Sequence, residues 1–288
     1  MNTELKGHLL ALFTIICWGT TFISTKILLA DFTPIEIMVT RFAIGLMILY
    51  ILRPEPIKFR YEEHRLYLMM AALCGVTLYY LMENIALTYT YASNVGIIIS
   101  TSPFFAVILA RFTLKNQQLR APFFIGFILA IIGIGCISLE SYNLHFNPRG
   151  DILALGAAVL WAVYAVIIRK IAIFRYDMIT ITREIFLYGL ILMVPVFLFT
   201  GFRVDLIYLL NPINLGNMLY LGICASALCF LSWNFATQYL GVLKTTVYIY
   251  ATPVITLITA FLILGEPITL LKLAGIILTI GGLVVSQK

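Results

Sequence analysis

The chain has 288 residues, of which 62% are hydrophobic and only 11% are charged. A soluble domain carries about 25% charged residues and about 45–50% apolar ones, so this composition excludes a soluble globular protein. The formal net charge is +6. The positions of the basic residues along the chain follow a pattern typical of membrane topology, so this charge does not indicate a nucleic-acid partner. The composition predicts an all-α integral membrane protein that lies in a lipid bilayer.

Ten apolar stretches follow one another from the N-terminus to the C-terminus. A helix of about 20 apolar residues, at ~1.5 Å per residue, is long enough to cross the hydrocarbon core of a bilayer. The connections between the stretches are short, which leaves no room for an independent soluble domain. The predicted spans are 8–28, 33–52, 66–88, 92–112, 120–139, 151–170, 178–200, 215–238, 244–264 and 268–286.

The basic residues indicate the orientation of these spans. With the N-terminus in the cytoplasm, thirteen of the 19 Lys and Arg residues fall on the cytoplasmic side and two, Arg41 and Arg183, lie within spans. Four fall on the other side: Lys26, Arg149, Arg203 and Lys272. Positive residues concentrate in cytoplasmic loops of membrane proteins. We therefore expect a multi-pass protein of the cell (cytoplasmic) membrane, an inner membrane where two exist, with both termini in the cytoplasm.

Cysteine and histidine usage does not indicate an enzyme. All five cysteines lie within predicted spans and form no Cys-x-x-Cys pair, and the three histidines lie at predicted ends or in a loop. The sequence has no metal-ligand spacing, no Gly-x-Ser-x-Gly elbow and no phosphate-binding loop. The first span lacks a small-residue cleavage site and reads as a retained helix. We expect no enzymatic activity, no cofactor, no metal and no self-contained ATP-driven pump.

The two halves of the chain resemble each other. In 7–26 and 150–169, five residues recur at a shift of 143: Gly7, Leu10, Ala11, Leu12 and Trp18 match Gly150, Leu153, Ala154, Leu155 and Trp161. At shifts of 149 to 150, Asn84, Ala86, Tyr89, Pro103, Gly126 and Gly133 match Asn234, Ala236, Tyr239, Pro253, Gly275 and Gly282. Each repeat, 7–140 and 150–286, holds five spans. Because five is odd, the second repeat is inverted, which is a common architecture of secondary transporters.

These features together resemble the EamA-type members of the drug/metabolite transporter superfamily. The likeness rests on ten spans in two repeats, a Trp in the first span of each repeat, a Pro in the fourth, and the segment LGEPITLLKLAGIILTIGGLVV at 264–285. It covers about 7–286, although Lys115-Asn116 stands in the first repeat where the second has Gly265-Glu266. The resemblance implies a central cavity lined by spans 1, 3, 4, 6, 8 and 9, with spans 5 and 10 at the periphery. It also implies a transported metabolite or drug.

Polar and aromatic residues at helical spacing mark the faces that would line such a cavity, since polar side chains within a bilayer face a bundle interior or a water-filled space. Packing of helix against helix is the alternative for the serines and threonines, and burial in the core is the alternative for the aromatic residues. The candidate substrate-binding residues are Trp18, Thr21, Tyr80, Glu83, Asn84, Ser100, Trp161, Tyr164, Trp233, Asn234 and Tyr250.

Two prolines and four glycines have special positions within spans. Pro103 and Pro253 cannot donate the backbone hydrogen bond that would reach the carbonyl groups of Ile99 and Ile249. They mark hinges, cavity-lining carbonyl groups or a fixed kink. The glycines Gly126, Gly133, Gly275 and Gly282 are expected to allow two helices to pack closely.

Glu83 is an acidic residue inside an otherwise apolar span, and two interpretations remain open. Arg41, in the second span, is predicted at a similar depth, so an ion pair would neutralise both side chains. Alternatively, Glu83 binds a cationic amine or carries a coupling proton. The repeat places Trp233 opposite Glu83, so one side of the site would carry a charge and the other an aromatic face. This combination suits an amine attached to an apolar or planar body.

We expect a secondary-active transporter that exports small organic, amino-acid-like metabolites by alternating access, driven by the substrate gradient or by proton coupling. Two alternatives stay open: a flippase of lipid-linked metabolites, and an importer or exchanger of a nucleotide-type compound such as S-adenosylmethionine. A channel is disfavoured by the inverted repeat and by the lack of a ring of charged residues. The protein would act as a monomer or homodimer.

Overall fold

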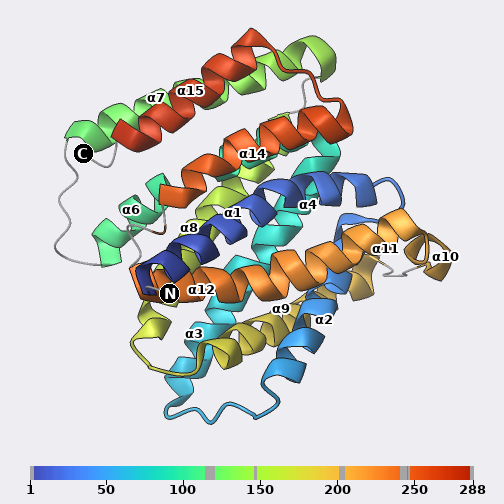
Figure 1. Ribbon diagram of the computed structural model, residues 1–288, viewed down its shortest axis with the longest axis vertical. Helices are drawn as coiled ribbons and strands as arrows, with labels where there is room; N and C mark the ends of the chain where they lie inside the picture. Colours follow the sequence, from blue (N-terminus) through green and yellow to red (C-terminus); the bar gives the residue numbers. More distant parts are fainter. Residues whose placement is uncertain are drawn as a thin grey trace.

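The computed structural model describes residues 3–113, 121–145, 148–200, 205–240, 245 and 247–285, and every regular element in these ranges is a helix. Long helices run in both directions through one bundle, and the two chain ends lie at the same end of it (Figure 1). We call this the terminal end and the other the opposite end. The all-α prediction is confirmed for these residues; Lys115, Asn116 and Arg203 lie outside them.

In the first half of the chain, two unbroken helices precede several interrupted ones. α1 spans Thr3–Leu28 and α2 spans Pro34–Leu52. Thr33 begins α2 with a capping box: its hydroxyl accepts from the Glu36 N–H while the Glu36 carboxylate accepts from the Thr33 N–H. The remaining elements are α3 (Glu62–Ala72), a π-helical segment (Leu73–Leu78), α4 (Tyr79–Tyr89), α5 (Ala92–Ile99), α6 (Ser102–Thr113) and α7 (Ala121–His145).

The second half follows a related order. Its long helices are α8 (Pro148–Ala172) and α9 (Met178–Thr200), and the short α10 (Leu206–Leu209) comes next. α11 (Pro212–Leu219), a π-helical segment (Tyr220–Leu228) and α12 (Cys229–Leu240) run on continuously. A 3₁₀ segment (Val247–Ala251), α14 (Thr252–Thr259), a π-helical segment (Ala260–Leu264) and α15 (Leu270–Val285) complete the chain. Gly265, with φ of 65°, ends the last π-helical segment in a left-handed conformation that glycine adopts without strain.

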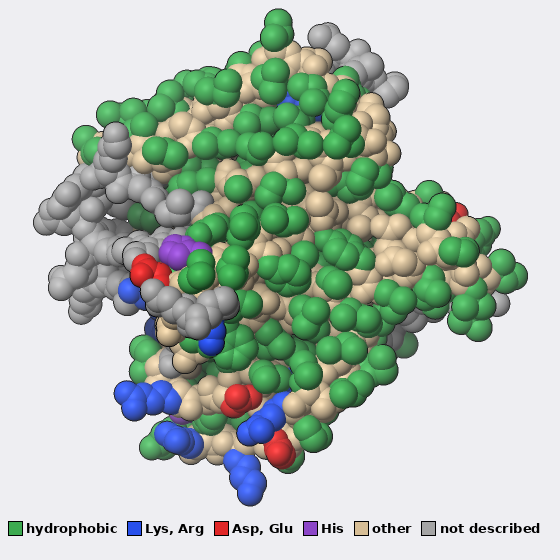
Figure 2. Space-filling view, viewed as in Figure 1, with side chains coloured by type: hydrophobic (Ala, Val, Ile, Leu, Met, Phe, Trp, Pro, Cys, Tyr) green, Lys and Arg blue, Asp and Glu red, His purple; other side chains and the backbone are tan. Residues whose placement is uncertain are grey.

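Seven apolar helical segments within the described residues are long enough to cross a membrane: Thr3–Leu28, Pro34–Leu52, Glu62–Tyr89, Ala92–Leu109, Pro148–Ile171, Met178–Val196 and Pro212–Leu240. Three shorter apolar helices, Ala121–Ile137, Tyr248–Leu264 and Leu270–Val285, lie where the other three spans are predicted. The protein is therefore a multi-pass membrane protein. Its surface is mostly apolar in Figure 2, and Lys and Arg side chains gather at the lower left. The exposed basic residues Arg53, Lys58, Arg60 and Arg65 lie between the end of α2 and the first turn of α3.

α7 and α15 form a closely packed pair at one edge of the bundle (Figure 1). A Cβ atom added to Gly133 would lie 2.5 Å from the carbonyl oxygen of Gly275, and one added to Gly282 would collide with the carbonyl oxygen of Gly126. Such distances are far inside van der Waals contact, so only glycine allows the two backbones to approach this closely. The predicted role of these glycines in packing is confirmed.

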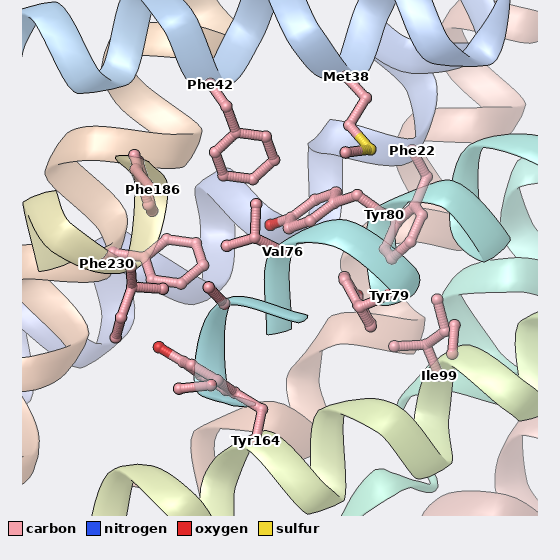
Figure 3. Close-up of a cluster of buried hydrophobic side chains, with 14 of the residues drawn as sticks. Phe22, Met38, Phe42, Val76, Tyr79, Tyr80, Ile99, Tyr164, Phe186 and Phe230 are labelled. Atoms are coloured by element: carbon pink, nitrogen blue, oxygen red, sulfur yellow. The ribbon is translucent and has the colours of Figure 1, made fainter. Parts of the chain in front are cut away.

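The main core lies between the remaining helices and is rich in aromatic residues (Figure 3). Phe42 of α2 packs edge-to-face against Tyr80 of α4 and against Phe186 of α9, with ring centroids 4.8 Å apart in both pairs. Tyr164 of α8 and Phe230 of α12 close the cluster from the other side, as Figure 3 shows. This core holds α1, α4, α8 and α12 around the middle of the bundle.

Candidate functional site

The three tryptophans of the chain, which lie far apart in the sequence, meet in the middle of the bundle. The Trp18 and Trp161 rings pack edge-to-face with centroids 5.4 Å apart, and the Trp18 and Trp233 centroids are 5.3 Å apart. The Trp18 indole N–H donates to the carbonyl oxygen of Ala225 at 3.0 Å, which fixes its ring against the second half of the chain. Aromatic pairs at this spacing are worth about 0.5–1.5 kcal/mol beyond their buried area.

A small space, which we call the chamber, lies beside the tryptophans and has a volume of about 50 Å³. It is lined by α1, α4, the α5–α6 break, α8 and α14. The lining side chains include Trp18, Thr21, Tyr79, Tyr80, Glu83, Ser100, Ser102, Trp161 and Thr252. A space this size holds only a few water-sized groups. The prediction that these faces of α1, α4 and α5 turn towards one another agrees with this geometry.

A larger space of about 630 Å³, the wide cavity, continues from the chamber towards the terminal end. The two spaces share Ser102, Trp161 and Ile249. The wide cavity lies between α6, α8 and α12, and Tyr164, Trp233 and Asn234 line it. Its far part is lined by Arg169, Arg175, Tyr176 and Gln238. Its volume falls within the roughly 300–1,000 Å³ that is typical of small-molecule sites.

Glu83 lies in the chamber without a salt-bridge partner. Its side chain is 2% exposed, and its Oε1 atom is buried without a hydrogen-bond partner. Two neighbours act on this carboxylate: the hydroxyl group of Tyr79 by a hydrogen bond, and the charge of Arg41 from beyond salt-bridge distance. No Lys, Arg or His nitrogen lies within 4.0 Å of this carboxylate among the described residues.

Arg41 does not pair with Glu83, in contrast to the first interpretation from the sequence. Its Nε donates to the Ser226 hydroxyl at 3.1 Å, and its guanidinium group lies 4.5 Å from the centre of the Tyr80 ring. Both of its terminal nitrogens are buried without a hydrogen-bond partner. Glu83 lines the chamber beside residues of α1 and α14, whereas Arg41 contacts Ser226 of the Tyr220–Leu228 segment. Helix rotation cannot be deduced from depth alone.

At the opposite end of the bundle, charged side chains form what we call the Glu266 cluster, where the chain breaks between α4 and α5. The Glu266 carboxylate accepts hydrogen bonds from the Ala92 N–H at 2.7 Å, the Ser93 N–H at 3.1 Å and the Ser93 hydroxyl at 2.5 Å. It therefore caps the N-terminus of α5. Lys26 donates to the carbonyl oxygens of Leu87 and Thr90, at the C-terminus of α4.

Lys272 belongs to the same cluster. Its ammonium group lies 4.7 Å from the centre of the Tyr91 ring and donates to the Pro267 carbonyl oxygen at 3.3 Å. Below the cluster, Thr256 of α14 donates to the Gly19 carbonyl oxygen at 2.8 Å and also packs on Gly96. These contacts join elements from both halves of the chain and separate the chamber from the opposite end.

Nine of the eleven predicted substrate-binding residues line the two spaces, and Asn84 and Tyr250 do not. The Asn84 amide donates to the Pro34 carbonyl oxygen at 3.1 Å and joins α4 to α2. Tyr250 packs in a separate cluster with Phe104 and Phe123. The helical period places Asn84 beside Glu83, but a rotation of about 100° per residue is enough to turn it out of the cavity.

The two predicted hinge prolines stand at helix starts. Pro103 is the second residue of α6 and lines the wide cavity. Pro253 is the second residue of α14 and is buried away from both spaces. Proline is favoured in the first turn of a helix, where its missing N–H has no intrahelical partner. Ile99 and Ile249, whose carbonyl groups these prolines leave free, both line the chamber.

Several lining residues were not predicted from the sequence. Tyr79 could have been found, because it lies four residues before Glu83 and therefore on the same face of α4. Ser102 lies just after the end of α5, where the helical period gives no prediction. Arg169, Arg175 and Tyr176 lie at the end of α8 and in the loop after it, where periodicity carries no information. Within the described ranges, no group of three or more His, Cys, Asp or Glu side chains is placed to hold a metal ion.

Comparisons with known proteins agree with this architecture. An uncharacterized transporter of Archaeoglobus fulgidus is 31% identical over 282 residues, which cover 96% of each chain. A protein of Streptantibioticus cattleyicolor named "Probable terminal-alkyne amino-acid exporter" is 26% identical, over 96% of this chain and 91% of its own. A solved crystal structure with 18% identity superposes with a TM-score of 0.69 over 98% of this chain and 97% of its own, which supports the fold alone.

The family assignment follows from the profile of the EamA-like transporter family. It matches residues 5–139 and 148–287, almost the full length of the chain. The similarity therefore extends through both groups of helices that line the chamber and the wide cavity, and the relatives named above are transporters. This chain is a membrane transporter that belongs to the EamA-like transporter family.

Proposed function

We propose that the protein is a secondary-active carrier that moves a small, amino-acid-like organic solute through the bundle by alternating access. The observation that carries this proposal is the wide cavity of about 630 Å³, which runs from the terminal end to the chamber in the middle of the bundle. Helices from both halves of the chain line it, while the Glu266 cluster and the α14 contacts close the opposite end. A space open towards one end and closed at the other is what a carrier presents in one of its two states.

In this proposal the chain forms ten transmembrane helices in two inverted five-helix repeats, 7–140 and 150–286. Both termini are cytoplasmic, and the protein lies in the cell membrane. The wide cavity then opens to the cytoplasm, so the structure corresponds to the state that accepts solute for export. The exposed basic residues Arg53, Lys58, Arg60 and Arg65 support this orientation, because positive residues favour the cytoplasmic side. The name of the amino-acid exporter among the relatives supports the solute class.

The residues proposed to contact the solute are the predicted residues that line the two spaces: Trp18, Thr21, Tyr80, Glu83, Ser100, Trp161, Tyr164, Trp233 and Asn234. Asn84 and Tyr250 are left out, because they line neither space. Pro103 and Pro253 are proposed as hinges, because each stands where a membrane-crossing segment changes from one helix to the next. Trp161 has the most informative position, since it lines both the chamber and the wide cavity.

Transport by purified protein in liposomes tests this proposal. Uptake of radiolabelled amino acids, polyamines, purines and S-adenosyl compounds is measured with and without an imposed pH gradient, for the wild type and for Trp161→Leu. The matched control is Phe124→Leu, because Phe124 is exposed on α7 and lines neither space. We expect one amino-acid-like solute to move, with transport lost in Trp161→Leu and kept in the control.

Three other outcomes contradict the proposal. If no soluble solute moves but a lipid-linked compound is flipped, the flippase alternative replaces the carrier. If only S-adenosyl compounds or other nucleotide-type compounds move, the solute class is wrong while the carrier stands. Equal transport by the wild type and Trp161→Leu removes the assignment of the cavity as the route. A pH gradient that accelerates uptake adds proton coupling to the mechanism, and an absence of effect leaves the solute gradient as the driving force.

A further inference from the structure

Among the residues that the structure describes, Glu83 is the only carboxylate that lines either space, and its surroundings indicate which chemical group it binds. Its buried Oε1 atom has no hydrogen-bond partner, and Arg41, the nearest candidate for an ion pair, is held by Ser226 and Tyr80 instead. A buried carboxylate without a directly paired counter-ion is costly, by several kcal/mol in real proteins. A cation that enters the chamber would relieve this cost.

The hydroxyl groups of the chamber add to this preference. The Thr21 hydroxyl donates its proton to the Trp18 carbonyl oxygen at 2.7 Å, and the Ser100 hydroxyl donates to the Ile97 carbonyl oxygen at 2.6 Å. Each hydroxyl has one proton and two lone pairs, so these two present only acceptors to the chamber. Together with Glu83 they match a ligand group that has several N–H donors and no acceptor. An ammonium group has this property.

The shape of the two spaces fits a molecule with a small charged head and a larger apolar body. The chamber, at about 50 Å³, has room for a head of a few water-sized groups. The wide cavity that continues from it carries the rings of Trp161, Tyr164 and Trp233. The aromatic faces of Trp18, Tyr79 and Tyr80 surround the chamber, and such faces attract cations.

The charges along the path also orient such a molecule. Glu83 lies in the chamber, whereas Arg169 and Arg175 lie in the part of the wide cavity towards the terminal end. A solute with one positive and one negative group therefore enters with its positive group first. A negatively charged head in the chamber would meet Glu83 with no compensating donor from a charged side chain lining that space.

We propose that the chamber is the binding site for the primary ammonium group of the transported solute, with Glu83 as its counter-ion and the aromatic rings of the wide cavity around its apolar or planar body. This inference rests on the proposed function and specifies the part of the solute that the site recognises. Ligands without an ammonium group, and trimethylated ammonium ions that cannot donate hydrogen bonds, are disfavoured.

Binding to purified protein in nanodiscs tests the inference without the need for transport. The probes share one phenyl body: 2-phenylethylamine, its N,N,N-trimethyl derivative and 3-phenylpropanoate, each titrated by calorimetry. The variants are Glu83→Gln and Glu83→Asp. Glu36→Gln is the matched control, because glutamine also satisfies the capping box of α2. Gel filtration and circular dichroism verify that each variant is folded, and Glu83→Asp keeps the negative charge if the glutamine variant does not fold.

We expect the primary amine to bind more tightly than both other probes, and Glu83→Gln to weaken it on the order of tenfold or more. Glu83→Asp and Glu36→Gln should keep the preference for the amine. Equal amine affinity in the wild type and Glu83→Gln overturns the inference, and so does a preference for the carboxylate or the failure of any amine to bind. Because solute uptake is measured separately, transport that does not depend on Glu83 refutes only this inference. Glu83-dependent binding without transport refutes only the proposed function.

Discussion

Glu83 and Glu266 are both buried glutamates of the same bundle. Glu83 lies near its middle and is 2% exposed, whereas Glu266 lies at its opposite end and is 5% exposed. The Glu266 carboxylate accepts three hydrogen bonds and caps a helix, whereas Oε1 of Glu83 has no partner and faces a chamber. The first arrangement lowers the free energy of the folded state. The second raises it and leaves an interaction available for a ligand. The same residue type is therefore structural at one place and available for function at the other.

Replacement of Glu266 should have the largest effect on stability. Glu266→Ala removes both acceptor oxygens, and with them all three hydrogen bonds, and leaves two backbone N–H groups of α5 without partners. Hydrogen bonds to charged groups are worth about 1.5–3 kcal/mol each, so we expect the free energy of unfolding to fall by about 3 kcal/mol or more. Thermal unfolding in detergent measures this. Glu83→Gln is the comparison: because Glu83 lacks these bonds, its removal should leave stability unchanged or higher. A larger loss for Glu83→Gln than for Glu266→Ala would refute the distinction.

Gly282→Ala should disturb the α7–α15 pair and spare both glutamate regions. The added methyl group would collide with the carbonyl oxygen of Gly126, and over-packing of this kind typically costs about 1–3 kcal/mol. We expect a fall in unfolding temperature with an unchanged preference for the amine probe. Gly281→Ala is the matched control, because a Cβ at Gly281 has no neighbour within 4 Å. Loss of amine binding in Gly282→Ala would mean that the peripheral helices contribute to the site.

Lys26 extends the comparison to one of the two lysines of the Glu266 cluster. Lys26→Met keeps the length of the side chain but leaves the carbonyl oxygens of Leu87 and Thr90 without their charged donor. A cation at a partly buried helix C-terminus is worth up to about 2 kcal/mol, and we expect a loss of about 1–2 kcal/mol. Lys26→Arg, which retains the charge, should lose less. Chemical unfolding monitored by tryptophan fluorescence measures the stability of both variants. Equal stability of Lys26→Met and Lys26→Arg would contradict the helix-capping role.

Asn84→Ala should have the smallest effect and gives the sharpest local contrast with Glu83. It removes the single hydrogen bond to the Pro34 carbonyl oxygen, worth about 1 kcal/mol. Because Asn84 lines neither space, amine affinity should stay within about twofold of the wild type, a free-energy difference under about 0.5 kcal/mol. Calorimetry with 2-phenylethylamine measures this. A loss comparable to that of Glu83→Gln would return Asn84 to the binding site.

The comparison also indicates which features can be predicted from sequence. The membrane-embedded position of Glu83 and its place on one face with Tyr80 follow from hydropathy and the helical period. The role of Glu266 does not, because it lies after a turn and caps a helix more than 170 positions earlier in the chain. The stripe that contains Trp18 and Thr21 was predictable, and so was the close packing at Gly133 and Gly275.

The amino-acid sequence by itself determined that this is a helical membrane protein. Its long apolar runs enter the lipid bilayer, where a helix satisfies the backbone N–H and C=O groups by hydrogen bonds within the same segment. It also determined most of the faces that turn inward. Only the tertiary structure decided that Arg41 binds Ser226 and Tyr80 while Glu83 remains unpaired, and that Asn84 and Tyr250 lie outside the cavity. Depth in the membrane follows from counting residues, but the rotation of one helix against another is set by side-chain packing between segments far apart in the chain.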